Sequence, residues 1–235
     1  MLPVAILAGG LATRLRPLTE TIPKSLVEIE GEPFLWRQLR LLRENGLKRV
    51  VLCVSHLGEQ VRDSVGDGAA FGLRIDYSFD GAEMIGTAGA LKRAEALLGE
   101  SFFVLYGDSY LPIDWSAVES AFLESGKAGL MTVYRNEGQW DTSNVEFVDG
   151  QILAYNKRLR TARMRHIDYG LGVLQSVALA RVPAGQAWDL ATLYGDLLNA
   201  GELAGFEAPH RFYEIGSFSG IEELRAYLSQ GRESA

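Results

Sequence analysis

The sequence is poor in cysteine and in long apolar runs. Cys53 is the only cysteine among 235 residues, so no intramolecular disulfide can form. It lies in the apolar run Val50–Val54, where we expect a buried, unreactive thiol. This run and Phe102–Tyr106 have the length of a strand, whereas a membrane span needs about 20 apolar residues. We therefore expect no transmembrane helix.

Positive charge is also scarce. The chain has 23 Lys and Arg against 30 Asp and Glu, a formal net charge of -7, and no block of five or six like charges. We expect neither a nucleic-acid surface nor an anionic-membrane surface, although a local basic pocket is compatible with this charge. The first ten residues lack the basic and apolar parts of an export signal, so the sequence predicts a cytoplasmic protein.

What the sequence does contain is an alternation of strand-length and helix-length segments. Expected strands cover residues 4–8, 49–54, 73–77, 102–106 and 130–134, and expected helices cover 33–45, 57–65, 87–98 and 114–123. Such alternation implies crossover connections, which favour parallel pairing. The sequence therefore predicts an α/β fold with a Rossmann-like, mostly parallel sheet flanked by helices, in one domain over residues 1–235.

The second half is richer in β-structure. It predicts a hairpin over 145–155, a strand over 168–174, a helix over 189–199, and a last helix that ends at Leu228. Ser219 and Glu222 resemble a capping box for that helix, and Thr87 and Asp114 are expected N-caps. We place this small β-rich insertion over the carboxyl ends of the parallel strands, where open α/β sheets bind ligands.

A glycine-rich loop follows the first expected strand. Gly9 and Gly10 allow close approach of the backbone to a ligand, and Arg14 and Lys24 supply positive charge. These features suit a phosphate chain, although a glycine turn with two solvated basic residues is the simpler alternative. The loop contains neither G-x-G-x-x-G nor the Gly-Lys-Ser/Thr ending of a P-loop, which disfavours those two nucleotide folds.

The wider sequence around this loop resembles the signature of the sugar-phosphate nucleotidyltransferases. The matching segments, in the family's order, are residues 7–10, 13–19, 23–27, 86–91, 107–108 and 213–216. Within the family, the sequence most resembles the mannose- or heptose-1-phosphate guanylyltransferases. The resemblance implies a GT-A-like nucleotidyltransferase fold, with a nucleotide-binding core in residues 1–135 and a sugar-phosphate-binding part and C-terminal helix in residues 136–235.

The resemblance also implies a nucleotide site. Its expected residues are Leu7, Ala8, Gly9, Gly10, Thr13, Arg14, Lys24, Asp80, Gly86 and Thr87. Asp80 lies near the family's base-reading position, and a carboxylate can accept from both the N1–H and the N2–H of guanine. We therefore favour GTP over UTP or dTTP. The alternative for Asp80 is a solvated turn aspartate before Gly81.

Two acidic residues are the expected magnesium ligands. Asp108 follows the strand 102–106, and Mg²⁺ needs only one or two carboxylates besides phosphate oxygens and water. The family motif that ends in Gly216 implies Glu214 as the second ligand. The family usually has aspartate there, so the longer glutamate leaves direct ligation open, with a surface ion pair as the alternative.

The sugar-phosphate side is implied by the later segments. Lys157 resembles the family's lysine that neutralises the sugar phosphate, with Asn156 in place of the usual acidic neighbour. Asp168 and Gly170 lie where relatives contact sugar hydroxyls, with a turn-stabilising aspartate as the alternative for Asp168, and Asn144 is an expected sugar contact. The three histidines, His56, His166 and His210, have no metal-site spacing and are expected to be structural or exposed.

The implied reaction joins a nucleoside triphosphate and a sugar 1-phosphate with release of pyrophosphate. Arg14, Lys24 and Asp108 are the expected catalytic residues. Three alternatives stay open: a glycosyltransferase, disfavoured because Gly107-Asp108-Ser109 replaces Asp-x-Asp; a molybdopterin-type nucleotidyltransferase; and a non-catalytic nucleotide sensor. The sugar and the oligomeric state, including a homo-oligomer, are also left open.

Overall fold

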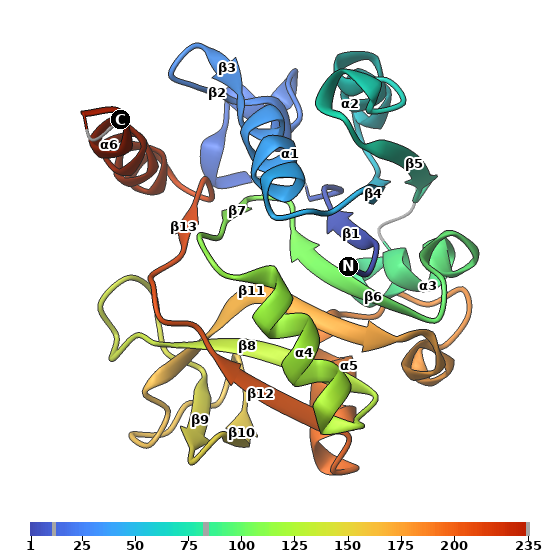
Figure 1. The fold of residues 1–235 in the computed structure, drawn as a ribbon, viewed down its shortest axis with the longest axis vertical. Helices are drawn as coiled ribbons and strands as arrows, with labels where there is room; N and C mark the ends of the chain where they lie inside the picture. The colour runs from blue at the N-terminus through green and yellow to red at the C-terminus, as the bar shows by residue number, and fades with distance from the viewer. Residues whose placement is uncertain (11–12, 82–84, 234–235) are drawn as a thin grey trace.

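The structure is a computed structural model that describes residues 1–10, 13–81 and 85–233 (Figure 1). Leu11 and Ala12 of the glycine-rich loop lie outside the described residues. The main sheet has nine strands: β1 (Val4–Leu7), β4 (Arg49–Val54), β5 (Arg74–Phe79), β6 (Ser101–Tyr106), β8 (Gly129–Arg135), β9 (Val145–Val148), β10 (Gln151–Tyr155), β11 (His166–Gln175) and β12 (Leu203–Glu207).

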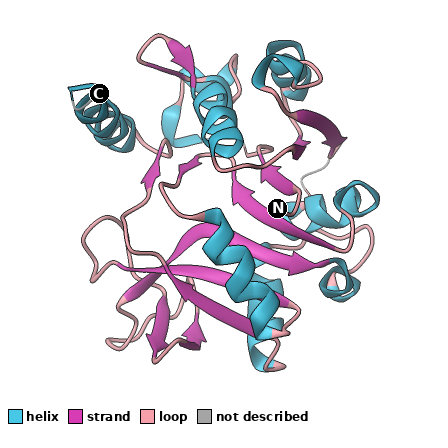
Figure 2. Cartoon of the chain, viewed as in Figure 1, coloured by secondary structure: helices cyan, strands magenta, loops and turns pink. Residues whose placement is uncertain are grey.

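The remaining elements surround this sheet (Figure 2). The α-helices are α1 (Phe34–Glu44), α2 (Gly58–Val65), α3 (Gly86–Leu98), α4 (Trp115–Ser125), α5 (Leu190–Asn199) and α6 (Phe218–Glu233). Five short 3₁₀ turns are η1 (Thr13–Leu15), η2 (Leu18–Glu20), η3 (Lys24–Leu26), η4 (Ala69–Phe71) and η5 (Ser176–Arg181). Two small ribbons pair β2 (Glu28–Ile29) with β3 (Glu32–Pro33), and β7 (Ser109–Tyr110) with β13 (Tyr213–Glu214). None of the described helices could cross a bilayer, because none combines the necessary length and apolarity.

The strand order is β10-β9-β11-β6-β1-β4-β5, with β8 beside β11 and β12 beside β8. The first half, β6-β1-β4-β5, is parallel, as its alternating pattern predicts. β11 then runs antiparallel to both β6 and β8. The predicted α/β fold with a helix-flanked sheet is confirmed. The sheet is mixed, because β11, a strand in the middle of the sheet, runs antiparallel to its neighbours β6 and β8.

Alternation along the strands decides which face each side chain buries. In β1, Val4 and Ile6 belong to one apolar cluster, which also holds apolar residues of α1, α2 and α4. Ala5 belongs to the other cluster, with residues of α3 and α5. Helices therefore cover both faces of the parallel strands, which explains why these strands read as continuous apolar runs.

The β-rich part lies where it was expected. β11 is antiparallel to β6, with Leu171 opposite Leu105, so the first residues of β11 lie beyond the carboxyl end of β6. The hairpin β9–β10 joins there, through the pair His166 and Val145. The insertion is thus part of the main sheet, and residue 135 falls at the end of β8 inside that sheet.

Two of the three predicted helix caps were wrong. The Asp114 carboxylate accepts from the amides of Ser116 and Ala117, as predicted. Thr87 does not cap α3, since that helix begins one residue earlier and the Thr87 hydroxyl accepts instead from the Leu190 amide at 2.7 Å.

The predicted capping box of the last helix was also misplaced. α6 begins at Phe218, so Ser219 lies inside its first turn. The hydroxyl of Ser217 accepts from the Gly220 amide at 3.1 Å, and Ser217 is therefore the cap. Glu222 pairs with Arg225 on the helix surface.

Candidate active site

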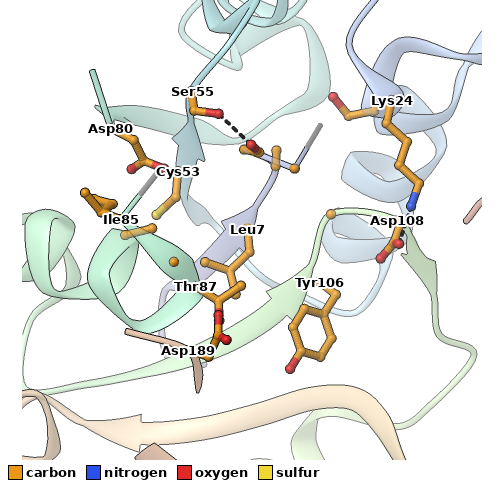
Figure 3. Close-up of a pocket in the computed structure, with 17 residues that line it drawn as sticks. Leu7, Lys24, Cys53, Ser55, Asp80, Ile85, Thr87, Tyr106, Asp108 and Asp189 are labelled. Carbon is orange, nitrogen blue, oxygen red and sulfur yellow. Dashed lines mark hydrogen bonds and ion pairs between the residues drawn. The ribbon is translucent and has the colours of Figure 1, made fainter. Parts of the chain in front are cut away.

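A cleft of about 310 Å³, called cleft A, opens at the carboxyl ends of β1, β4, β5 and β6 (Figure 3). Parallel strands present their carboxyl ends at one edge of the sheet, so loops distant in sequence meet there. Its lining includes nine of the expected site residues: Leu7, Ala8, Gly9, Gly10, Lys24, Asp80, Gly86, Thr87 and Asp108. Ser25, Cys53, Ser55, Ile85, Ala90, Tyr106, Gly107 and Asp189 complete it.

Two glycines permit the close packing of this edge. A Cβ at Gly107 would lie 2.6 Å from the Leu7 carbonyl oxygen, a distance that carbon atoms do not tolerate. A Cβ at Gly9 would lie 3.1 Å from both Asp80 Oδ2 and Ser55 Oγ. The Ser55 hydroxyl donates to the Gly9 carbonyl at 2.5 Å and holds the glycine-rich loop against the end of β4. The loop therefore approaches its neighbours closely, and its two glycines add no side chain to the lining of cleft A.

Asp80 stands at the inner end of cleft A, directly after β5. Burial raises the pKa of its carboxyl to about 6, although the nearby Arg93 acts in the opposite direction. Its Oδ1 atom is buried and has no hydrogen-bond partner among the described residues, and the same is true of the Ser25 hydroxyl. Buried polar atoms of this kind are nearly always satisfied, so both are suited to a bound ligand. Asp80 is thus a buried residue of the cleft, which argues against a solvated turn aspartate.

The start of α3 is fixed by the segment that precedes α5. Gly86 has φ +73°, and a Cβ there would lie 2.6 Å from the Trp188 carbonyl oxygen. The hydroxyl of Thr87 is used by Leu190, as described above. Both residues line cleft A, but their small or polar side chains are also required for this packing. Asp189, the N-cap of α5, makes no capping hydrogen bond with its side chain and lies beside Thr87 in the cleft (Figure 3).

Asp108 lies where the predicted strand end places it. Its Oδ2 atom is 2.5 Å from Nζ of Lys24, which stands on η3. The buried Gln38 of α1 supports this loop, because its amide nitrogen donates to the carbonyls of Tyr106 and Ser109 at 3.2 and 2.8 Å. The Asp108 carboxylate is therefore presented from a rigid backbone.

Glu214 is brought beside Asp108 by the ribbon β7–β13. Glu214 pairs with Ser109, and the Ile215 amide donates to the Asp108 carbonyl at 2.9 Å. Burial raises the pKa of Glu214, and the negative charge of Asp108 raises it further, although Lys24 and Arg14 act in the opposite direction. Two carboxylates in this proximity suit a cation that prefers oxygen ligands, and Mg²⁺ is such a cation. Among the described residues, no group of three or more His, Cys, Asp or Glu side chains is arranged to hold a metal ion.

A second cleft of about 300 Å³, called cleft B, adjoins cleft A and shares Tyr106 and Asp108 with it. Cleft B lies between the start of β11, the loop before β9 and the segment after β10. The rest of its lining is Ser109, Asp141, Thr142, Asn144, Lys157, Arg160, Ile167, Asp168, Tyr169, Gly170, Phe212 and Glu214. All four expected sugar-side residues are therefore in one cleft.

Asp168 is the centre of a polar network in cleft B. Its Oδ2 atom accepts from the hydroxyls of Tyr155 and Tyr106 at 3.2 and 3.5 Å, and Nζ of Lys157 lies 3.6 Å away. The side-chain oxygen of Asn144 accepts from the Asp168 amide at 3.0 Å. Burial and the charge of Asp168 raise the pKa of Tyr106 well above its ordinary value, so this phenol is a neutral donor. Asn144 thus positions Asp168.

Some predicted residues lie elsewhere. Thr13 and Arg14 belong to η1 and line neither cleft, and the charge of Arg14 acts on Glu214 instead of on cleft A. Gly170 has φ +99°, and a Cβ there would lie 2.9 Å from the Ser109 hydroxyl, so a glycine is needed at this bend of β11.

The remaining candidates have structural roles. Cys53 is buried, as predicted, and burial raises the pKa of its thiol, which disfavours the reactive thiolate. His166 is also buried, and its Nε2 atom lies 3.2 Å from Glu207 Oε1. Sequence reasoning missed Ser55, Tyr106, Asp141, Arg160 and Asp189 as cleft residues. None of them belongs to a recognisable local motif. The only sequence feature that could have indicated Arg160 is the series of arginines that follows Lys157.

The structure is thus an α/β protein with two adjoining clefts at the carboxyl edge of its parallel strands. The model of the nucleotidyl transferase family matches residues 4–142, and the chain belongs to this family. It is 30% identical over 213 residues to UTP–glucose-1-phosphate uridylyltransferase of Synechocystis sp.. The matched region covers 83% of this chain and 55% of the relative.

Two further comparisons agree with this assignment. The chain is 41% identical over 113 residues to N-acetylmuramate alpha-1-phosphate uridylyltransferase of Neisseria meningitidis serogroup B, which covers 48% of this chain and 49% of the relative. The chain thus spans about half the length of these curated relatives. The crystal structure of HddC from Yersinia pseudotuberculosis complexed with GMP-PN has a TM-score of 0.79 and 25% identity, over 97% of this chain and all of that one.

Proposed function

We propose that this chain transfers a nucleoside monophosphate from a nucleoside triphosphate, with GTP favoured, to a sugar 1-phosphate. The products are pyrophosphate and a nucleoside diphosphate sugar. The observation that carries the proposal is that clefts A and B meet at Asp108 and Tyr106. A nucleotide in cleft A and a sugar phosphate in cleft B would have their phosphates side by side at the Asp108 carboxylate. Family membership and the transferase names of both relatives support this reading.

The reaction is an in-line displacement. An oxygen of the sugar phosphate attacks the α-phosphorus and forms the new P–O bond, while the bond from that phosphorus to the β-bridging oxygen breaks. Pyrophosphate leaves with the electron pair. The attacking group is already an anion, so no protein nucleophile is required, and catalysis depends on alignment and on neutralisation of charge.

The chain's own residues supply most of that charge. Lys24 reaches the junction of the clefts from the side of cleft A, and Lys157 reaches cleft B beside Asp168. Arg14 stands behind Glu214, where it offsets the charge of the carboxylates. Asp108 and Glu214 would hold Mg²⁺, which supplies further neutralisation of the phosphate oxygens when bound.

The preference for GTP rests on Asp80. Its Oδ1 atom is buried and has no partner among the described residues, and the residue lines cleft A together with Gly9 and Gly86 at the start of α3. An ionised carboxylate accepts from the two adjacent donors of guanine, whereas uracil offers one donor between two acceptors. Both relatives named above are uridylyltransferases. These two relatives do not support GTP, so the proposed preference rests on the chemistry of Asp80 in this chain.

The test is pyrophosphate release with Mg²⁺ across a matrix of four nucleoside triphosphates and several sugar 1-phosphates. We expect turnover with one favoured pair and its loss in Asp108→Ala. Asp63→Ala removes an exposed carboxylate of α2, distant from both clefts, and serves as the matched control. Saturable nucleotide binding without turnover would favour a sensor. Sugar transfer from a nucleotide sugar without pyrophosphate would favour a glycosyltransferase.

A further inference from the structure

The segment that contributes Lys157 and Arg160 to cleft B carries an excess of positive charge. The segment 157–165 contains five basic residues and no acidic one: Lys157, Arg158, Arg160, Arg163 and Arg165. The whole chain has a formal net charge of -7, so this local excess runs against the composition of the protein. Uncompensated cations repel one another, and a segment of this kind is stabilised by an anion.

Only part of this charge is neutralised within the protein. Arg163 pairs with the buried Glu146 at 3.3 Å, and Lys157 lies 3.6 Å from Asp168. Arg160 forms no ion pair with any residue in the described ranges, yet it lines cleft B. It is therefore a guanidinium placed beside the sugar-phosphate cleft with its donors available.

A local turn directs Arg160 to that cleft. The side-chain oxygen of Asn156 accepts from the amides of Arg158 and Leu159 at 2.9 and 2.8 Å, which bends the chain directly after β10. Lys157 and Arg160, three residues apart, then both line cleft B. Arg158 instead lines a neighbouring groove between β10 and α5, which shares Lys157 with cleft B but does not include Arg160. The turn thus places Arg160 in cleft B and Arg158, two residues earlier, in the other groove.

We propose that Arg160 binds a second acidic group on the sugar 1-phosphate, and that the substrate class is a sugar 1-phosphate with an additional carboxylate or phosphate. This inference rests on the proposed function. Lys157 and Asp168 meet the needs of a neutral sugar 1-phosphate, since one is a cation for the phosphate and the other accepts from hydroxyls. A guanidinium pairs with a carboxylate or a phosphate through two parallel hydrogen bonds. Arg160 does not line cleft A, so the nucleotide is not its partner.

The test compares matched pairs of sugar 1-phosphates that differ in one acidic group. The pairs are N-acetylmuramate 1-phosphate with N-acetylglucosamine 1-phosphate, glucuronate 1-phosphate with glucose 1-phosphate, and glucose 1,6-bisphosphate with glucose 1-phosphate. The first two pairs probe a carboxylate and the third probes a phosphate. We expect kcat/KM of the wild-type protein to be roughly 10- to 100-fold higher for the acidic member of at least one pair, as one charge-assisted contact allows.

The variants locate this preference. Arg160→Gln should lower the acidic-to-neutral ratio of kcat/KM to about 1, and Arg160→Lys should retain part of it, since lysine keeps the charge without the paired donors. Arg158→Gln is the matched control and should leave the ratio unchanged, because this side chain lines the other groove. A thermal melt of each variant reports on folding, and we expect little change for these exposed positions.

Three results would overturn the inference. The first is a wild-type protein that prefers no acidic member of the three pairs. The second is an Arg160→Gln variant that loses the same factor with both members of the preferred pair. The third is an Arg160→Gln variant that mainly raises KM for the nucleoside triphosphate. If no pair releases pyrophosphate, the proposed function itself fails, which is a different observation from turnover without preference.

Discussion

Nζ of Lys24 lies 2.5 Å from Oδ2 of Asp108, although 84 positions separate the two residues in the sequence. The lysine therefore occupies the position beside the carboxylate that a magnesium ion would share. If the site binds magnesium as proposed, the charge of Lys24 and that of the ion would compete for Asp108, because both would be attracted to the same oxygen. Removal of either residue should change the response of the reaction to magnesium.

Substitution of Lys24 and substitution of Asp108 should change the magnesium concentration for half-maximal rate in opposite directions. Lys24→Gln frees Asp108, so the magnesium concentration for half-maximal rate should fall, while Asp108→Asn should raise it. Both variants should lower kcat by roughly 100- to 1000-fold, the usual loss when one charged group is removed from a transition state. Magnesium titrations of pyrophosphate release measure both quantities. Lys92→Gln on α3, which breaks a surface pair with Glu95, is the control and should change neither.

The affinity for GTP should depend on pH through Asp80. Burial raises the pKa of this carboxyl to about 6, and the proposed contact with guanine would require its ionised form. KM for GTP should therefore fall as the pH rises through about 6, by about tenfold for each pH unit below that value. Initial rates between about pH 5 and pH 8 measure the effect. Asp80→Asn should bind GTP more weakly and without this dependence; an unchanged profile in Asp80→Asn would contradict the assignment.

The same carboxyl should influence stability with a defined sign. Its pKa is raised from 3.8 to about 6 in the folded protein, so its stabilising contribution is complete below about pH 4 and is lost as the pH rises through about 6. Asp80→Asn cannot ionise. The free energy of unfolding of Asp80→Asn, relative to the wild type, should therefore increase between about pH 4 and pH 7. Urea unfolding at several pH values tests this, and a difference that does not vary with pH would refute it.

Gly107 should not tolerate a side chain. Its Cβ would lie 2.6 Å from the Leu7 carbonyl oxygen and 2.9 Å from Ala8 Cα, and both are backbone atoms that cannot rotate away. Gly107→Ala should destabilise the protein by about 1–3 kcal/mol, as overpacking does, and displace Asp108. Gly195→Ala is the matched control, because a Cβ in the middle of α5 meets nothing within 4 Å. That variant should gain about 0.5–1 kcal/mol from the lower entropy of its unfolded chain. Chemical denaturation compares the two.

Arg211 should support the sugar side of the site. Its guanidinium carbon lies 3.4 Å from the centre of the Trp140 ring and 4.5 Å from that of Tyr213. The contact joins the loop that carries Asp141 into cleft B to the strand that carries Glu214. Arg211→Ala should raise KM for the sugar 1-phosphate by roughly 3- to 30-fold, since a cation–π contact is worth about 0.5–2 kcal/mol. KM for the nucleotide should change much less.

The control for this experiment is Arg225→Ala on α6, whose ion pair with Glu222 lies on the surface. It should leave both KM values unaltered. An equal rise of the two KM values in Arg211→Ala would point to general loosening of the structure and would contradict a role for the stack in the sugar cleft.

Local patterns predicted the parts of the molecule that local forces determine. The strand 49–54 was predicted to the residue, because its apolar run is buried on both faces. Asp108 was located for the same reason, since a residue that follows a buried strand must reach the ligand edge of the sheet. Asp114 was recognised as a cap because its partners lie two and three residues away.

Other features depend on contacts between distant segments. The Thr87 hydroxyl accepts from the amide of Leu190, which begins α5 and lies 103 positions away, so no local pattern could predict this contact. Two serines, Ser217 and Ser219, lie near the start of the last helix. Because the helix begins at Phe218, Ser217 is the residue that caps it. Asp189 and Arg160 are cleft residues only because β11 reverses direction and brings the second half of the chain beside β6.

The pairing of β6 with β11 places both clefts on one hydrogen-bonded scaffold, with Tyr106 as a common wall. In the proposed reaction, the separation of the two ligands would thus be set by a sheet and would not need to be re-established by a hinge in each cycle. A nucleoside diphosphate sugar would occupy both clefts through one covalent tether, and its two halves would raise each other's effective concentration. Strong product inhibition and slow product departure are the expected cost of this rigidity, and a non-cleavable bisubstrate mimic should be a tight inhibitor.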